Sequence, residues 1–174
     1  MNSALRIAIA DDEPDMREYF QHLLPRLGHT VVAAARDGRE LVELCRTTEP
    51  NLVITDIKMP EMDGIEAAIQ IYQDRPIPVI LVSAHQDANL IERADLDHVM
   101  AYLVKPIKQG DLAPSIAIAE RRFEQFETMR QEATDLRQAL ADRKVIEKAK
   151  GILMQKGALD ESDAFRRLQK LASE

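Results

Sequence analysis

Short apolar runs alternate with amphipathic stretches over the first 106 residues of the chain. Five runs of strand length are expected at residues 5–10, 30–35, 52–56, 78–83 and 101–104. Helical spacing of apolar residues predicts helices at 15–27, 38–48 and 65–72, and a more polar helix at 87–94. Short buried strands that alternate with helices are typical of a parallel sheet covered on both faces. The pattern therefore predicts an α/β domain with five parallel strands.

The pattern changes after Pro106. Residues 109–155 contain one proline, Pro114, in an expected first helical turn, and after Gly110 no glycine before Gly151. Apolar residues recur there at steps of three and four, namely Leu112, Ile116, Ala119, Phe123, Phe126, Met129, Ala133, Leu136 and Leu140. Two consecutive steps of three meet at Phe126, which equals a three-residue insertion in a heptad register. A long helix is expected, which either lies along its own domain or, as favoured by its length, pairs with a second copy.

The last segment is predicted to hold two further helices. The first, residues 142–156, places apolar side chains on one face and ends at Gly157. The second begins at residues 159–162 with acidic residues, as the positive end of a helix dipole favours. Two helices of this length cannot bury both apolar faces against each other, so a third helix or a partner is expected to cover them.

Charge and composition narrow the function classes. The net charge of −7 divides into −8 over residues 1–106, −1 over 107–140 and +2 over 141–174, so any polyanion that the protein binds is expected to contact the tail. Aromatic residues make up 4% with no Trp, which disfavours a stacking platform for single-stranded nucleic acid. The single Cys45 excludes an internal disulfide and is expected in the core. No apolar run approaches the roughly 18 residues of a membrane span, and the N-terminus lacks a signal-peptide pattern, so we expect a cytoplasmic protein.

Four of the five expected strands end in a polar functional group. Asp11 and Asp12 follow the first strand, Asp56 ends the third, Ser83 ends the fourth and Lys105 follows the fifth. Ligands of open α/β sheets bind at this edge. Three converging carboxylates need a counter-charge, which Mg²⁺ supplies. A carboxylate can also attack phosphorus to give an acyl phosphate, whose oxygens an ammonium and a hydroxyl would hold. The spacing therefore predicts a Mg²⁺-dependent pocket that accepts a phosphoryl group.

These segments resemble the receiver domain of two-component response regulators. The matching motifs, within residues 5–120, are Asp11–Asp12, Ile54–Gly64, Val82–Ala84 and Tyr102–Pro106. The resemblance implies a flavodoxin-like fold with strand order 2-1-3-4-5. It also implies a sensor histidine kinase as the phosphoryl donor. Such a domain hydrolyses its own acyl phosphate slowly, and we do not expect the protein to be an enzyme in any wider sense.

The same resemblance assigns a role to each residue of the pocket. Asp56 would be the phosphoacceptor, and Asp11, Asp12 and the backbone carbonyl of Lys58 would join it around Mg²⁺. Phosphoryl sensing is expected at Ser83 and Lys105, and Tyr102 would be the aromatic residue whose rotamer follows the hydroxyl residue. The bond from Lys105 to Pro106 is expected to be cis, a form that only proline adopts at low cost.

Residues from about Leu136 resemble the ANTAR module, a three-helix RNA-binding output of transcription antitermination regulators. The resemblance rests on Leu140–Met154 and Asp160–Leu168. The candidate contacts to RNA hairpins are the cations flanking the apolar faces, namely Arg143, Lys144, Lys148, Lys150, Arg166 and Arg167. Two features depart from the family: Gln169 stands where Arg is usual, and the sequence ends at Glu174, where a third helix should follow. A truncated module is therefore expected.

The expected layout is a receiver domain at 1–120, a helical linker or coiled coil at 109–141 that overlaps its last helix, and an ANTAR-like module at 142–174. The leading hypothesis is a homodimeric regulator whose phosphorylation places two modules on tandem RNA hairpins. The alternative is a phosphorylation-dependent protein-interaction switch that binds no nucleic acid, and the small positive charge of the tail makes DNA binding a weaker third. RNA binding should weaken steeply with salt, whereas an apolar helix interface should not.

Overall fold

The computed structural model describes residues 4–84 and 99–171. Five parallel strands form one sheet in the order β2-β1-β3-β4-β5, as the family resemblance implies. The strands are β1 Arg6–Ala10, β2 Thr30–Ala35, β3 Leu52–Asp56, β4 Val79–Ser83 and β5 Val99–Val104. The predicted strands are thus confirmed to within two residues at each end. The predicted polar helix at 87–94 lies outside the described residues.

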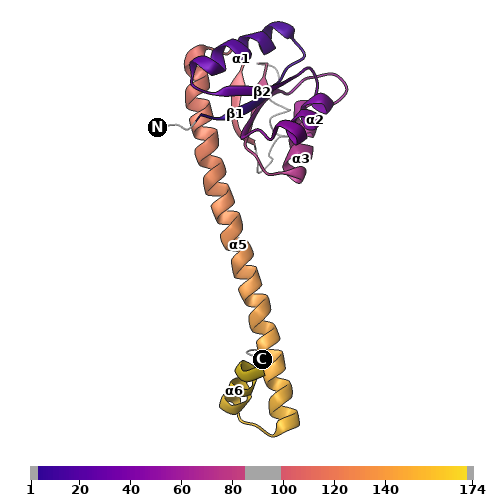
Figure 1. The fold of residues 1–174 in the computed structure, drawn as a ribbon, viewed down its shortest axis with the longest axis vertical. Coiled ribbons are helices and arrows are strands. Elements are labelled where there is room, and N and C mark those ends of the chain that lie inside the picture. The colour runs from indigo at the N-terminus through magenta and orange to yellow at the C-terminus, as the bar shows by residue number, and fades with distance from the viewer. Residues whose placement is uncertain (1–3, 85–98, 172–174) are drawn as a thin grey trace. The chain divides into compact units, whose positions relative to one another are not determined.

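Helices cover both faces of the sheet (Figure 1). They are α1 Pro14–Arg26, α2 Gly38–Thr48, α3 Gly64–Asp74 and the first part of α5 Gln109–Gly157. One core cluster joins α1 and α5 to the sheet and includes Phe20, Leu24, Leu112 and Ile116. A second joins α2 and α3 to the other face and includes Leu41, Val42, Cys45 and Ile65. The alternation of strand side chains between two faces accounts for the two clusters.

An aspartate N-cap precedes each of the helices that follow β2 and β3. The Oδ1 of Asp37 accepts a hydrogen bond from the backbone N–H of Glu40 at 2.9 Å, and Asp63 does the same for Glu66 at 2.7 Å. Asp is a favoured N-cap residue because its carboxylate satisfies an otherwise unpaired amide of the first turn. Both caps fix where the chain leaves the carboxyl edge of the sheet.

The chain divides into two compact units, Met1–Phe126 and Glu127–Glu174, and α5 contributes to both. In the first unit, the apolar stripe of α5 is buried as far as Ala119, and Phe123 and Phe126 pack partly buried against the same core. Beyond the boundary, Met129 and Leu136 are 60% and 67% exposed. The heptad break in the sequence therefore coincides with the point where the helix leaves its own domain. The part of α5 up to Phe126 lies along that domain, and pairing of the remainder with another copy stays a prediction.

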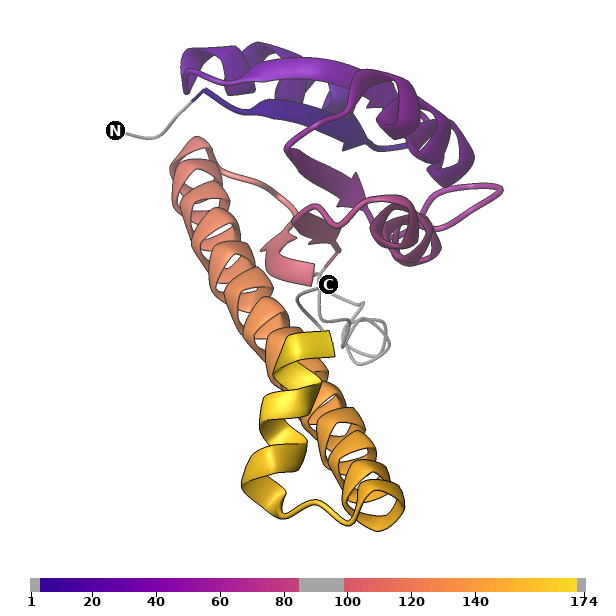
Figure 2. The same ribbon diagram turned by 60° about the horizontal axis from the view of Figure 1, so that its bottom comes forward.

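The second unit is a helical hairpin, defined here as residues 127–171. A separate helix from Asp142 was expected, and this is wrong: α5 continues unbroken to Gly157. Residues 138–142 contain no helix breaker, and the Gln138 side-chain amide donates to Asp142 Oδ1 across the expected boundary. After Gly157, α6 Glu161–Leu171 turns back beside the end of α5 (Figure 1 and Figure 2).

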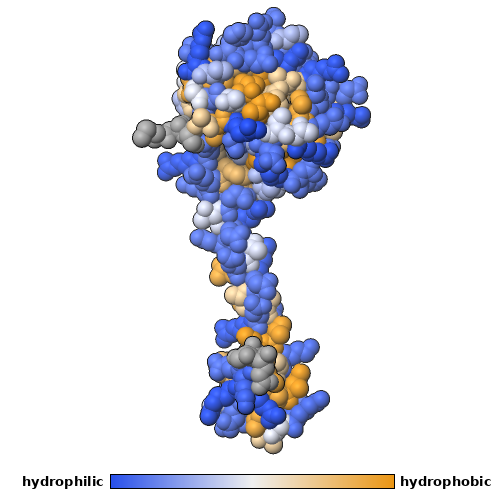
Figure 3. All heavy atoms as spheres, viewed as in Figure 1, coloured by the Kyte–Doolittle hydropathy of each residue, from blue (hydrophilic) through white to orange (hydrophobic). Residues whose placement is uncertain are grey.

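The hairpin buries little of its apolar surface. Ala164 is fully buried, whereas Val145, Phe165 and Leu171 are 67%, 45% and 58% exposed. Hydrophobic residues accordingly show on its surface in Figure 3. The prediction that two such helices cannot cover each other's faces is confirmed for the described residues. Among the described helices, none combines the length and apolar character of a membrane span.

Candidate functional site

Strand register brings the predicted pocket residues to one edge of the sheet. Asp56 pairs with Val82, and the following amide of Ile57 donates to the carbonyl of Val82 at 2.9 Å. The amide of Lys105 donates to the carbonyl of Ser83, also at 2.9 Å. Because all five strands are parallel, the chain passes from strand to loop at the same level in each. The site predicted from four separated motifs is therefore a single place in the fold.

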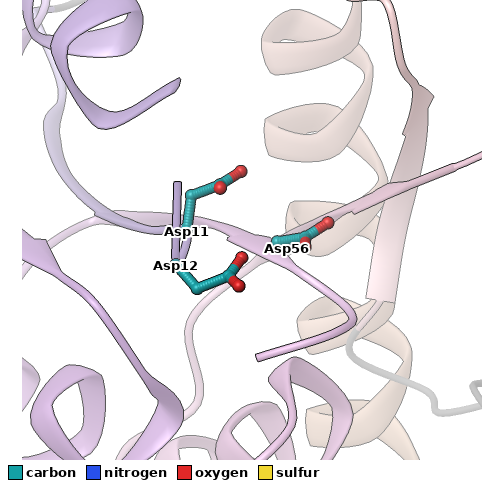
Figure 4. A group of neighbouring side chains, drawn as sticks. All are labelled: Asp11, Asp12 and Asp56. Carbon is teal, nitrogen blue, oxygen red and sulfur yellow. The ribbon is translucent and has the colours of Figure 1, made fainter. Parts of the chain in front are cut away.

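Three carboxylates converge there (Figure 4). One oxygen from each of Asp11, Asp12 and Asp56 lies within 4.8 Å of the others. Asp11 and Asp56 are buried, whereas Asp12 is exposed. The buried Oδ2 of Asp11 faces the ammonium of Lys105 as an ion pair. Carboxylate oxygens from three residues at this separation fit a hard divalent cation such as Mg²⁺.

Lys105 supplies the positive charge of the pocket. Its Nζ lies 3.1 Å from Asp11 Oδ2 and 3.6 Å from Asp56 Oδ1. It also lies 3.2 Å from Oε1 of Glu13, a partner that the sequence analysis missed. The signal was available, since Glu13 directly follows the acidic pair. One ammonium thus faces three carboxylates, and part of the negative charge is left uncompensated.

Burial and charge shift the titration of these groups. Burial, together with the carboxylates of Asp11 and Asp12, raises the pKa of Asp56 to about 6, although Lys105 opposes the shift. Burial also raises the pKa of Asp11. Burial would lower the pKa of Lys105, but its hydrogen bond to Asp11 and the charge of Asp56 raise it overall. The metal-free pocket therefore resists full ionisation, which is the condition that a bound cation relieves.

The remaining predicted pocket residues lie around this cluster. Ser83 is buried at the end of β4, and Tyr102 lies partly buried in β5 against the core on the α2 and α3 face. Lys58 lines an open hollow beside Asp12. The bond between Lys105 and Pro106 is cis, as predicted. The assigned roles of these residues in metal binding, phosphoryl sensing and switching stay predictions.

Gly64 fixes the backbone that carries Asp56. A Cβ atom at this position would lie 2.0 Å from the backbone oxygen of Asp56. The amide of Gly64 donates to the carbonyl of Ile57 at 2.9 Å, which ties the start of α3 to the end of β3. No other residue fits this approach without moving the backbone that carries Asp56.

Cys45 takes no part in this chemistry. It is buried between α2 and the sheet, where burial raises the pKa of its thiol to about 12. A thiol that stays protonated is a poor nucleophile. The expectation that Cys45 is a core residue is confirmed.

The candidate RNA contacts lie on the hairpin. Arg143, Lys144 and Lys148 project from α5 as exposed side chains and form no ion pair within the described residues. Lys150 differs, because its Nζ lies 3.0 Å from Glu147 and 2.7 Å from Glu161. Hydrogen bonds to these two carboxylates raise its pKa. This lysine joins α5 to α6, so it could contact a phosphate only by leaving those partners.

The two candidates on α6 are also exposed. Arg166 Nη2 lies 3.3 Å from Asp163 Oδ1 and donates to the hydroxyl of Ser162. Arg167 forms no ion pair within the part of the chain that the structure describes. Apart from Lys150, the hairpin therefore presents single, weakly constrained cations rather than an organised charge cluster.

Comparison with known proteins agrees with this geometry. The response regulator receiver domain model matches residues 7–117, and the ANTAR domain model matches residues 134–174. The chain is 41% identical over 167 residues to the transcriptional regulatory protein PdtaR of Mycobacterium tuberculosis, covering 96% of this chain and 82% of that protein.

Solved structures match over the first unit. A response regulator receiver domain protein from Clostridium thermocellum superposes with a TM-score of 0.62 and 28% identity, covering 73% of this chain and 99% of that one. The receiver domain of a modulated diguanylate cyclase from Desulfovibrio desulfuricans G20 gives 0.65 at 24% identity, covering 70% and 98%, which supports the fold alone. The chain belongs to the two-component response regulators, with an N-terminal receiver domain and a C-terminal ANTAR domain.

Proposed function

We propose that a sensor histidine kinase phosphorylates this regulator on Asp56, and that the phosphorylated form controls gene expression by RNA binding and transcription antitermination. The observation that carries the proposal is the convergence of Asp11, Asp12 and Asp56 on Lys105 at the carboxyl edge of the sheet. The receiver and ANTAR matches support the same assignment.

The phosphoryl transfer needs an ionised Asp56. One of its carboxylate oxygens attacks the phosphorus of a phosphohistidine and forms a P–O bond, while the P–N bond breaks and its electron pair returns to the imidazole nitrogen. Mg²⁺ held by Asp11, Asp12, Asp56 and the carbonyl of Lys58 would supply positive charge to the phosphoryl oxygens. Attack by water then returns the carboxylate and releases inorganic phosphate. The protein acts as a regulator, and this slow hydrolysis is the turnover we assign to it.

The bound phosphoryl group is sensed by the side chains that end the neighbouring strands. The ammonium of Lys105 exchanges a carboxylate partner for a phosphoryl oxygen, and the Ser83 hydroxyl donates to another. Tyr102 is partly buried in β5, and its side-chain rotamer changes with the position of the Ser83 hydroxyl. These movements change the face of the receiver domain on which copies of the chain pair.

The output is carried by α5 and α6. The exposed stripe Met129–Leu140 of α5 pairs with a second copy and so places two hairpins side by side. Exposed cations on each hairpin then contact RNA phosphates, with Arg143, Lys144 and Lys148 the best placed. A kinase partner and an RNA target both assign the protein to the cytoplasm.

The test is binding to an RNA with two tandem hairpins, with and without beryllofluoride and Mg²⁺. The phosphoryl mimic should raise RNA affinity and shift the chain from monomer to dimer. The affinity should fall steeply between 50 mM and 200 mM salt because phosphate contacts release counterions. An RNA affinity that neither the mimic nor salt changes would contradict the proposal.

A protein-interaction switch is the second candidate function. The observation that favours it is the apolar surface of the hairpin, where Val145, Phe165 and Leu171 are exposed. Surfaces of this kind mark protein interfaces. In this case phosphorylation would change binding to a protein partner, and that binding would persist at 200 mM salt while RNA binding stayed undetectable.

A further inference from the structure

Arg17 holds the acidic loop by its backbone. It lies in the second turn of α1, and its Nη1 donates to the carbonyl oxygen of Asp11 at 2.7 Å and to that of Asp12 at 3.1 Å. The residue is partly buried. One guanidinium nitrogen therefore bridges two successive carbonyl groups, and the side chains of those same two residues enter the pocket.

The two carboxylates differ in what else anchors them. Asp11 Oδ1 accepts a hydrogen bond from the amide of Glu13 at 3.0 Å, and its Oδ2 faces Lys105. Asp12 is exposed, and its carboxylate has no hydrogen bond or ion pair within the described residues. Its place in the cluster of Figure 4 therefore depends on how its backbone is held. Arg17 is the side chain that holds it.

Arg17 also differs from Lys105 in the atoms that it occupies. Lys105 faces the carboxylate oxygens that a cation needs. Arg17 faces carbonyl oxygens and leaves those carboxylates free. A planar guanidinium can hold two acceptors in a fixed geometry while it adds positive charge beside an acidic cluster. Such a partner presets ligand orientation, and its loss in metal sites typically costs about 10-fold to 100-fold in affinity.

We propose that Arg17 is a positioning residue for the divalent cation. It presets the backbone of Asp11 and Asp12, so the affinity for Mg²⁺ depends on it, whereas the rate of phosphorylation at saturating Mg²⁺ does not. This inference rests on the proposed function, because it assigns Arg17 to the same Mg²⁺ site.

The experiment is a calorimetric titration of the whole chain with Mg²⁺. Arg17→Met should weaken Mg²⁺ binding by about 10-fold or more. Arg17→Lys keeps the charge but loses the planar guanidinium, so its affinity should fall between those of the wild type and Arg17→Met. Arg26→Met, in the last turn of the same helix, is the matched control and should bind as the wild type does. Val42→Ala, buried on α2, controls for a loss of stability far from the pocket.

The outcomes separate the inference from the function beneath it. A wild-type chain that binds no Mg²⁺ would sink the proposed function itself. Wild-type affinity in Arg17→Met, or a loss no larger than that of an equally destabilised Val42→Ala, would overturn the positioning role alone. If Arg17→Met does not fold, Arg17→Lys decides in its place, and wild-type affinity there overturns the inference. Near-normal phosphorylation from acetyl phosphate at saturating Mg²⁺, with weakened binding, supports it.

Discussion

The acidic pocket and the helical hairpin carry charge in opposite ways. The pocket draws Asp11, Asp56 and Ser83 from three different strands and leaves them 0%, 7% and 1% exposed. The hairpin carries its cations on the surfaces of two helices, where water and salt reach them. Charges in a buried site interact strongly, whereas exposed charges are screened and contribute little as single pairs.

The difference shows where single residues matter. In the pocket, each side chain is fixed by the register of the sheet and has neighbours that depend on it, so one substitution should change the whole site. In the hairpin, each cation contributes separately to the attraction for a polyanion, so one substitution should remove only a small part of the binding free energy. The effects of substitution should therefore decline from Asp56, the proposed phosphoacceptor, to the exposed lysines of the hairpin.

The largest effect is expected at Asp56. Asp56→Asn removes the carboxylate that we propose attacks phosphorus, so phosphorylation by acetyl phosphate with Mg²⁺ should become undetectable by intact-protein mass spectrometry. The matched control is Asp37→Asn, because Asp37 is also a buried acid near this edge but caps α2. Asn caps helices nearly as well as Asp, so the control should fold and accept phosphate normally. Phosphorylation of Asp56→Asn at the wild-type level would move the acceptor elsewhere.

The pocket was predictable because each of its main residues directly follows a strong apolar run. In a parallel sheet, that position alone brings Asp11, Asp56 and Lys105 together, independent of the conformation of the loops. Glu13 and Arg17 could not be assigned in the same way. Their contacts depend on the path of the loop and on side-chain rotamers one turn into α1, which strand order does not determine.

The hairpin was predictable in its elements and less so in its boundaries. Gly157 ends α5 as expected, but the chain gave no reason to break the helix at Asp142. The role of Lys150 was the harder case. In the sequence it is one more basic residue of α5, like Lys144 and Lys148, yet its partner Glu161 comes from α6. A contact between two helices depends on how they pack, and the spacing of residues in the sequence does not predict that packing.

Gly64→Ala should cause the second-largest effect. The added Cβ would lie 2.0 Å from the backbone oxygen of Asp56, so either α3 or the end of β3 must move. We expect a loss on the order of 3 kcal/mol in the free energy of unfolding, the upper end for overpacking. Urea denaturation measures it. Phosphorylation should slow as well, because the displaced backbone carries the acceptor.

Gly110→Ala is the control for this substitution. A Cβ at Gly110, in the first turn of α5, would meet nothing within 4 Å. Alanine is the better helix former, so this variant should be unchanged or more stable by about 0.5 to 1 kcal/mol. Equal destabilisation at both positions would show that the contact with Asp56 is not the cause.

The pH dependence of the free energy of unfolding should reveal the raised pKa of Asp56. Without metal, the pKa of Asp56 is about 6 against 3.8 for the free side chain. Its contribution to stability is therefore fully present below the unfolded value and is lost as the pH rises through 6. Asp56→Asn removes this loss. The free energy of unfolding of Asp56→Asn, relative to that of the wild type, should rise by about 2 kcal/mol between pH 4 and pH 7. Urea denaturation in the presence of a chelator measures it.

Mg²⁺ should reduce the stability advantage that Asp56→Asn has over the wild type at pH 7. A cation that binds the folded wild type stabilises it by mass action, and Asp56→Asn lacks one of the proposed ligands. The wild type should then gain more stability than the variant at pH 7 when Mg²⁺ replaces the chelator. An advantage of Asp56→Asn that does not change with pH would mean that Asp56 titrates as an ordinary exposed acid.

The smallest effects are expected at single lysines of the hairpin. Lys148→Gln should lower RNA affinity modestly and reduce the slope of log affinity against log salt by about 1, the share of one phosphate contact. Lys150→Gln should change the slope less, because Glu147 and Glu161 already hold that ammonium. Filter binding over 50 to 200 mM salt would measure both. Equal changes in slope would mean that RNA displaces the two carboxylates from Lys150. The hairpin would then resemble the pocket in one respect, because Lys150 and Lys105 would each exchange a carboxylate for a phosphate oxygen.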